Sequence, residues 1–189
     1  MRTILALSLG FTSLTLLFSC GSSKKMSNYT PFTRDLKQKL DVDNIDLKEI
    51  QFYVDQKIVL NRNLGSQDIT VKNGVVKQSN GKYINEVVIP SLTPGICTGT
   101  DFDRLLVSFE KGNSYLAFGP GSANNANNYV LYGTEWKLGT ALVSYDAEKF
   151  RARCGTCSDV AAVTLVIKKK ELDKLKRKTR KATGRTVSK

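Results

Sequence analysis

The chain has 189 residues, a formal net charge of +12 and no histidine. Without histidine, the Ser-His-Asp and Cys-His sets of hydrolases and the zinc sites that mix cysteine with histidine are excluded. Asp101 and Asp103 share a predicted loop, but neighbouring carboxylates are common on protein surfaces and do not define a catalytic pair. We therefore expect a protein that is not an enzyme and that holds neither a metal nor another cofactor.

Residues 1–19 have the pattern of a secretory signal peptide. Arg2 gives a basic start, and the stretch from Thr3 to Phe18 is uncharged and mostly apolar. This run of about 16 residues is shorter than the roughly 20 that a membrane-spanning helix needs. The pattern therefore predicts a segment that is cleaved rather than a retained transmembrane helix.

The apolar run ends on Leu17-Phe18-Ser19-Cys20, which resembles the lipobox of bacterial lipoproteins. The shared features are a branched apolar residue three positions before the cysteine, a small residue directly before it and the cysteine itself. Phe18 is bulkier than the residue usual at its position. The resemblance implies cleavage after Ser19, a diacylglycerol on the Cys20 sulfur and an acyl chain such as palmitate on the freed amine. The alternatives are an ordinary signal peptide and an uncleaved anchor.

The lipobox resemblance also implies a location and an organisation for the chain. Two or three acyl chains hold a protein firmly on a bilayer, whereas one chain holds it only marginally. The resemblance thus implies a membrane-anchored lipoprotein of a Gram-negative cell envelope, at either the inner or the outer membrane. Residues 20–31, the lipidated cysteine and a short polar stretch, are predicted to form a tether.

Residues 32–167 are predicted to form one globular domain that begins with helix. In "TPFTRDLKQKL" (30–40), Thr33 is a suitable N-cap, and Leu36 and Leu40 lie four apart on one helical face. A second short helix is expected over "DNIDLKEIQFYV" (43–54), where Asp46 and Glu49 have the spacing of a capping box.

From Lys57 onward, short segments rich in β-branched and aromatic residues are separated by turn dipeptides such as Asn73-Gly74, Asn80-Gly81 and Gly112-Asn113. They predict a mainly β domain, a small antiparallel β-barrel or sandwich preceded by one or two short helices. Two longer segments, 90–103 and 119–128, are predicted as loops. The predicted strands lie at 57–62, 68–72, 75–79, 82–89, 105–111, 114–120, 128–138, 141–146, 149–154 and 161–167.

Three cysteines of the domain, Cys97, Cys154 and Cys157, are candidates for a disulfide or a reactive thiol. The pair in "RCGTCS" resembles the CxxC of thioredoxins, but both of its flanks have strand patterns instead of a strand followed by a helix. Ser158 stands where c-type haem attachment needs histidine, and a cysteine-only metal site lacks a fourth ligand. A structural disulfide in an oxidising envelope, free thiols and thiol–disulfide exchange at Cys154 and Cys157 all remain open.

Aromatic residues of the β region have two interpretations. Their strand spacing is typical of core and sheet packing, and the same rings offer an aromatic face for a sugar. The residues are Tyr115, Tyr129, Tyr132, Trp136 and Tyr145.

Residues 168–189 are predicted to form a basic C-terminal tail that starts as strand or short helix. Its 11 Lys and Arg stand against Glu171 and Asp173, so the preceding 167 residues carry only +3. Near a bilayer, such residues are attracted to anionic head groups. We expect an anionic envelope polymer or an envelope protein as partner, and no nucleic acid, because the chain is exported. The candidate contact residues are Lys174, Lys176, Arg177, Lys178, Arg180 and Lys181.

The order of these pieces, a lipobox, a short tether, a helical "KEIQFYVDQKIVL" and a β domain, resembles that of small envelope lipoproteins of Gram-negative bacteria. That resemblance supplies no activity. The sequence favours a membrane-anchored, non-enzymatic lipoprotein with a binding or structural role. The alternative is an envelope protein that exchanges thiols and disulfides through Cys154 and Cys157.

Overall fold

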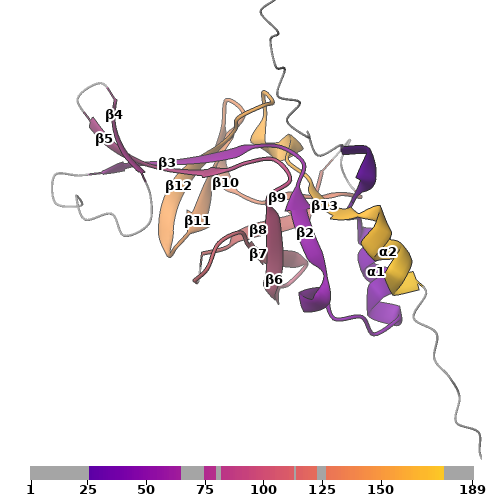
Figure 1. Cartoon of the computed structure of the whole chain (residues 1–189). Coiled ribbons are helices and arrows are strands. Elements are labelled where there is room, and N and C mark those ends of the chain that lie inside the picture. The colour runs from indigo at the N-terminus through magenta and orange to yellow at the C-terminus, as the bar shows by residue number, and fades with distance from the viewer. Residues whose placement is uncertain (1–25, 65–74, 80–81, 113, 123–126, 177–189) are drawn as a thin grey trace, which may run out of the picture.

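The computed structural model describes residues 26–64, 75–79, 82–112, 114–122 and 127–176. This part of the chain forms two antiparallel sheets, of seven and six strands, that pack as a sandwich without closing into a barrel (Figure 1). Two short α-helices, α1 (Arg34–Val42) and α2 (Lys169–Lys176), lie beside each other at one end. The prediction of a mainly β domain is confirmed, in its sandwich form.

The strands are ordered differently in space and in sequence. The seven-stranded sheet has the order β1 (Tyr29–Pro31), β13 (Leu165–Lys168), β2 (Gln51–Val54), β6 (Pro94–Asp101), β7 (Arg104–Ser108), β8 (Leu116–Pro120) and β9 (Tyr129–Leu131). The six-stranded sheet has the order β10 (Thr134–Lys137), β11 (Thr140–Tyr145), β12 (Glu148–Cys154), β3 (Ile58–Leu64), β5 (Lys82–Ile89) and β4 (Val75–Ser79).

One hydrophobic core fills the space between the sheets. Alternate residues of the strands point into it, as in β8, where Leu116 and Phe118 are fully buried. Phe32 lies at its centre, with its ring centroid 5.1 Å from those of Phe52 and Tyr129. Rings at this separation and tilt add to the stability that burial alone provides.

Helix α1 forms where the sequence predicts it. The Thr33 hydroxyl accepts a hydrogen bond from the Leu36 N–H at 3.1 Å, and Leu40 is buried against the core. Lys37 and Asp41, one turn apart, form an ion pair of 2.8 Å on the exposed side. Capping and a single apolar face therefore suffice to define this helix.

The prediction of a second helix over residues 43–54 is wrong. Asp46 does act as a cap, because its carboxylate accepts from the Lys48 N–H at 2.9 Å, but it caps only one 3-10 turn, η2 (Leu47–Glu49). The chain then becomes strand β2, whose Phe52 and Val54 are completely buried. Pairing with β13 on one side and β6 on the other overrides the local preference for helix.

The segment predicted as a loop at 90–103 contains strand β6. Gly95 makes the strand fit, since a Cβ there would lie 2.7 Å from the Phe109 ring and 2.8 Å from Val107. The register shifts between Cys97 and Gly99, which is typical of a bulge. Of the loop predicted at 119–128, residues 119 and 120 belong to β8 and 123–126 lie outside the described residues.

Other predictions fall partly or wholly outside the described residues. The strand predicted at 68–72 and the turns at 73–74 and 80–81 cannot be compared with the structure. The strands around the last turn do form a hairpin, with Ser79 opposite Lys82. The strand predicted at 128–138 is two strands, β9 and β10, one in each sheet.

Three chain segments pass from one sheet to the other at the same corner, and one of them is residues 90–93 between β5 and β6, where Leu92 N donates to Val54 O at 2.7 Å. β2 continues through Asp55 to Lys57 into β3, and β12 continues through residues 155–164 into β13. Because β2 pairs with β13 and β3 with β12, these segments are paired on both sides of the corner. The pairing also bridges it, since Asp55 N donates to Thr164 O at 3.1 Å and Gly155 N donates to Lys57 O at 2.7 Å. The corner joins the two sheets into one unit.

The folded region extends beyond the predicted boundaries at 32 and 167. Strand β1 pairs with β13, with Tyr29 opposite Lys168, so part of the predicted tether belongs to the sheet. At the other end, α2 follows β13 without a break, and its Leu172 and Leu175 pack against the core. The first and last strands are therefore neighbours.

Candidate functional site

The predicted lipidation residue, Cys20, lies outside the described residues, which begin at Met26. Five residues lie between the two, and the six residue steps from Cys20 to Met26 span at most about 22 Å.

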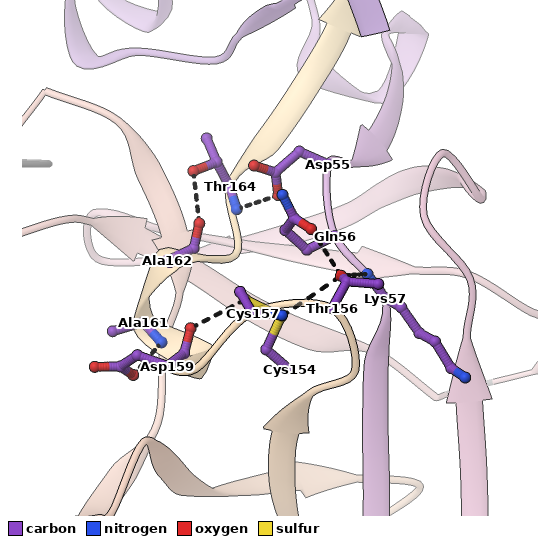
Figure 2. Close-up of a disulfide and its surroundings, with 10 residues drawn as sticks. All are labelled: Asp55, Gln56, Lys57, Cys154, Thr156, Cys157, Asp159, Ala161, Ala162 and Thr164. Atoms are coloured by element: carbon purple, nitrogen blue, oxygen red, sulfur yellow. Dashed lines mark hydrogen bonds between the residues drawn. A yellow bond between two sulfur atoms is a disulfide. The ribbon is translucent and has the colours of Figure 1, made fainter. Parts of the chain in front are cut away.

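Cys154 and Cys157 form a disulfide at the corner between the sheets (Figure 2). Cys154 ends β12 and is buried, whereas Cys157 is partly exposed. Their Cα atoms are 5.3 Å apart, within the usual range. The structure thus selects one of the pairings that the sequence left open.

Hydrogen bonds hold the disulfide loop on the crossing from β2 to β3 (Figure 2). The Thr156 hydroxyl donates to the Gln56 side-chain oxygen at 2.7 Å and accepts from the Lys57 N–H at 3.4 Å. Within the loop, the Cys157 N–H donates a hydrogen bond to Cys154 Sγ, with an N–S distance of 2.9 Å. The loop is therefore tied to the opposite chain segment by side chains as well as by backbone pairing.

Asp55 completes this corner. Its carboxylate accepts from the Thr164 N–H at 2.7 Å (Figure 2). Burial raises the pKa of the Asp55 carboxyl, and hydrogen bonds from backbone N–H groups, that of Thr164 foremost, partly offset this. The arrangement is that of a structural acceptor, because its partner is a backbone group of the same corner.

Cys97 is a free thiol inside the core, on β6. Its thiol donates to Gly99 O at 3.3 Å, and burial raises its pKa. A buried thiol with a raised pKa is a poor nucleophile. Cys97 therefore behaves as a small apolar core residue.

Within the described ranges, no three His, Cys, Asp or Glu side chains gather closely enough to hold a metal ion. The carboxylates considered from the sequence, Asp101 and Asp103, flank the turn between β6 and β7. Asp101 forms an ion pair of 2.5 Å with Arg104, so its charge is compensated.

The start of the basic segment is folded as α2. Lys174 is exposed on this helix, and the backbone of Lys176 ends it. Between α1 and α2 lies a groove of about 630 Å³, to which Leu36, Leu40, Leu172 and Leu175 contribute apolar surface. Of the other candidate contact residues, Arg177, Lys178, Arg180 and Lys181 lie outside the described part of the chain.

The aromatic residues divide into a buried and an exposed group. Tyr129 and Tyr145 are in the core, so the packing interpretation holds for them. Burial raises the pKa of Tyr129 to about 12, with a contribution from Asp103. Tyr132 is 43% exposed and Trp136 is 49% exposed. Tyr115, also exposed at 41%, lies elsewhere on the surface.

Tyr132 and Trp136 line one cleft, which has a volume of about 380 Å³. The cleft lies where the chain passes from β9 in one sheet to β10 in the other. Among the described residues, no charged side chain lines it. The remaining lining residues are Gly119, Pro120, Gly121, Ser122, Val130, Leu131, Gly133 and Ala161.

Arg104 holds the Tyr132 ring in place. Its guanidinium carbon lies 4.5 Å from the ring centroid, a cation–π contact, and its other partner is Asp101. Gly119 permits this arrangement, since a Cβ there would approach Arg104 to 3.2 Å and Tyr132 to 3.8 Å. Sequence reasoning singled out both rings but missed Arg104 and Gly119, because their association depends on the pairing of β7 with β8.

Comparison with family models, curated proteins and solved structures finds no match to this chain. In the described segments, no helix is long and apolar enough to cross a membrane.

Proposed function

We propose that this chain is a non-enzymatic, lipid-anchored binding protein of the bacterial cell envelope. The observation that carries the proposal is Leu17-Phe18-Ser19-Cys20 at the end of an apolar run, which has the residue types of a lipobox. The acyl chains on Cys20 supply the attachment, since each buried methylene contributes about 0.8 kcal/mol.

The fold is compatible with this role. A two-sheet domain with one core is a rigid body for presenting a binding surface, and its first strand begins close to the anchor. Because β1 and β13 are neighbours, the basic segment leaves the domain near the edge at which the anchored segment enters. The basic segment then adds attraction to anionic lipid or to an anionic envelope polymer.

A Cys20→Ser variant tests the anchor. The unaltered protein should sediment with membranes and carry acyl chains by mass spectrometry. The variant should appear in the soluble fraction without added mass, whereas a Ser23→Ala control should behave like the unaltered protein. A Cys20→Ser variant that still sediments, or an unaltered protein without acyl chains, would contradict the proposal.

The basic segment is tested separately on the Cys20→Ser background, where no lipid contributes to binding. Replacing Lys174, Lys178, Arg180 and Lys181 by glutamine should weaken binding to phosphatidylglycerol vesicles, since each basic residue near an anionic surface contributes about 1 kcal/mol. The loss should be larger at low salt than at high salt. Replacing Lys111, Lys137, Lys149 and Arg153, in the sandwich, is the charge-matched control. Equal binding by both variants at every salt concentration would show that the basic segment does not contribute to binding anionic vesicles.

A second proposal is thiol–disulfide exchange at Cys154 and Cys157, and one contact favours it. After reduction, the Cys157 N–H at 2.9 Å would stabilise a Cys154 thiolate. A dithiol would supply two electrons and two protons, which break the S–S bond and leave two thiols, while the dithiol itself becomes a disulfide. Alkylation after mild dithiothreitol treatment should then label Cys157 and Cys154 but not buried Cys97. If neither corner cysteine reacts without denaturant, exchange is excluded.

A further inference from the structure

We propose that the cleft between Tyr132 and Trp136 binds one or two rings of a neutral saccharide. The inference rests on the proposed function as a binding protein and names the ligand class. The cleft has a volume of about 380 Å³, which is at the small end of the range for small-molecule sites, roughly 300–1,000 Å³. An oligosaccharide longer than the cleft would extend from it into solvent.

Two exposed rings in one cleft favour a ligand with an apolar face. One side of a pyranose ring presents C–H groups with a slight positive charge, and the face of an aromatic ring is negative. The ring of Tyr132 is fixed by the Arg104 guanidinium, so little freedom is lost when a ligand stacks on it. Trp136 belongs to β10, an edge strand whose four residues are all exposed, so its ring is not needed for the core.

The rest of the lining suits the polar edge of a sugar. Gly119, Gly121 and Gly133 have no side chains, so the backbone itself lines part of the cleft; Gly121 N donates to Asn128 O at 2.8 Å, which leaves the carbonyl groups as acceptors for a ligand. Ser122, an exposed residue, also lines the cleft and brings a hydroxyl group to it. Backbone amides and hydroxyls are the groups that orient small polar ligands in such sites.

The charge around the cleft argues for a neutral ligand. In the part of the chain that the structure describes, no Asp, Glu, Lys or Arg lines it. Arg104, which contacts the Tyr132 ring, is compensated by Asp101 at 2.5 Å. Phosphorylated and carboxylated sugars would therefore enter without a counter-charge, which disfavours them.

The experiment uses the only tryptophan of the chain as its reporter. The full-length Cys20→Ser protein is screened on an array of neutral and anionic glycans, and the hits are titrated by Trp136 fluorescence and by calorimetry. Neutral glycans should bind and shift the emission of Trp136. Tyr132→Ala and Trp136→Ala should each raise the calorimetric Kd about tenfold or more, the loss of about 1.4 kcal/mol.

Tyr115→Ala is the matched control, because Tyr115 is exposed to a similar extent and does not line the cleft. It should leave both the affinity and the fluorescence change unaltered. The inference is overturned if no neutral glycan binds, if only anionic glycans bind, or if Tyr132→Ala and Trp136→Ala bind as the parent does. The acylated protein in detergent should give the same affinities, so failure of the anchor and failure of this site are separate results.

Discussion

Single residues at the corner between the sheets have effects that sequence distance conceals. Asp55 and Thr164 are far apart along the chain, yet the Asp55 carboxylate accepts the Thr164 N–H at 2.7 Å where both segments change sheets. A buried N–H without an acceptor costs about 1–3 kcal/mol. The corner therefore depends on a group whose charge is itself disfavoured by burial.

Asp55→Ala and Asp55→Asn separate the contribution of the hydrogen bond to Thr164 from that of the carboxylate charge. The alanine variant leaves the Thr164 N–H without its acceptor and should lose about 1–3 kcal/mol of unfolding free energy in urea at pH 7. The asparagine variant keeps an oxygen acceptor and should lose less. Because the raised pKa makes the native state bind a proton more readily than the unfolded state, the unaltered protein should gain stability relative to Asp55→Asn as pH falls from 7 toward 4. A difference between them that is independent of pH would contradict this account.

Phe102 shows the opposite case, a large side chain that contributes no burial. It is 96% exposed at the turn between β6 and β7, and its φ of 52° lies in the left-handed region. A side chain makes this conformation unfavourable by about 1–2 kcal/mol, a cost that glycine lacks.

Phe102→Gly should therefore be more stable than Phe102→Ala by about 0.5–1 kcal/mol in chemical denaturation. The control is the same pair of substitutions at Gln38, which is exposed in the middle of helix α1. There the order should reverse, since glycine is unfavourable inside a helix. Alanine equal to or better than glycine at position 102 would show that the left-handed turn is not retained.

At the scale of elements, α2 extends the folded domain into the basic segment. Leu172 and Leu175 are partly buried against the core, while Lys174 between them is exposed. Leu172→Ala and Leu175→Ala should each lower the free energy of unfolding by about 1–2 kcal/mol, because each removes partly buried apolar surface. Lys174→Ala should stay within about 0.5 kcal/mol of the unaltered protein. If all three variants unfold at the same denaturant concentration, α2 does not contribute to the core.

The strands and α1 were predictable because their signals are local. Runs such as Val59-Leu60 and the Thr33 cap are visible in a few neighbouring residues. Strand β6 was not, because it depends on pairing with β2 and β7, and Gly95 is required only because Phe109 lies close to it in the folded chain. The prediction of a second helix was wrong for the same reason. Asp46 does cap a turn, but the long-range pairing of β2 outweighs this local signal.

The residues of the candidate sites show the same difference between local and long-range signals. Cys154 and Cys157 were recognisable as a pair from spacing, but their pairing in preference to Cys97 depends on the fold, which places Cys97 on β6 in one sheet and Cys154 at the end of β12 in the other. Tyr132 and Trp136 were two of five aromatic candidates, and nothing local separates them from the buried tyrosines. Their common cleft results from a chain that leaves one sheet at β9 and enters the other at β10.

For the molecule as a whole, two core tyrosines govern stability at alkaline pH. Burial raises the pKa of Tyr129 to about 12 and raises that of Tyr145 further, and the Tyr145 hydroxyl also donates to Glu110 at 2.6 Å. Above pH 10 the unfolded state loses these protons while the native state keeps them. The native state therefore loses stability as pH rises, by about 1.4 kcal/mol per pH unit for each tyrosine.

This predicts a fall in unfolding free energy between pH 10 and pH 11.5 that urea titrations at each pH would measure. Tyr145→Phe should remove about half of the slope, whereas Tyr115→Phe, at an exposed position, should leave it unchanged. Absorbance at 295 nm should show two tyrosines that ionise only as the protein unfolds. An unfolding free energy that is constant over this range would contradict the assignment.

The edge position of β1 has a mechanical consequence. A pull on the N-terminal side of Tyr29 reaches first the three residue pairs that join β1 to β13. These pairs lie on the outside of the sheet, so the force opens them in succession instead of shearing them together. The next resistance to the pull comes from Phe32, whose side chain is fully buried in the core. Under load, strand β1 should yield before the sandwich does, lengthening the segment that precedes the core by three residues, about 10 Å, while the core and the cleft stay intact.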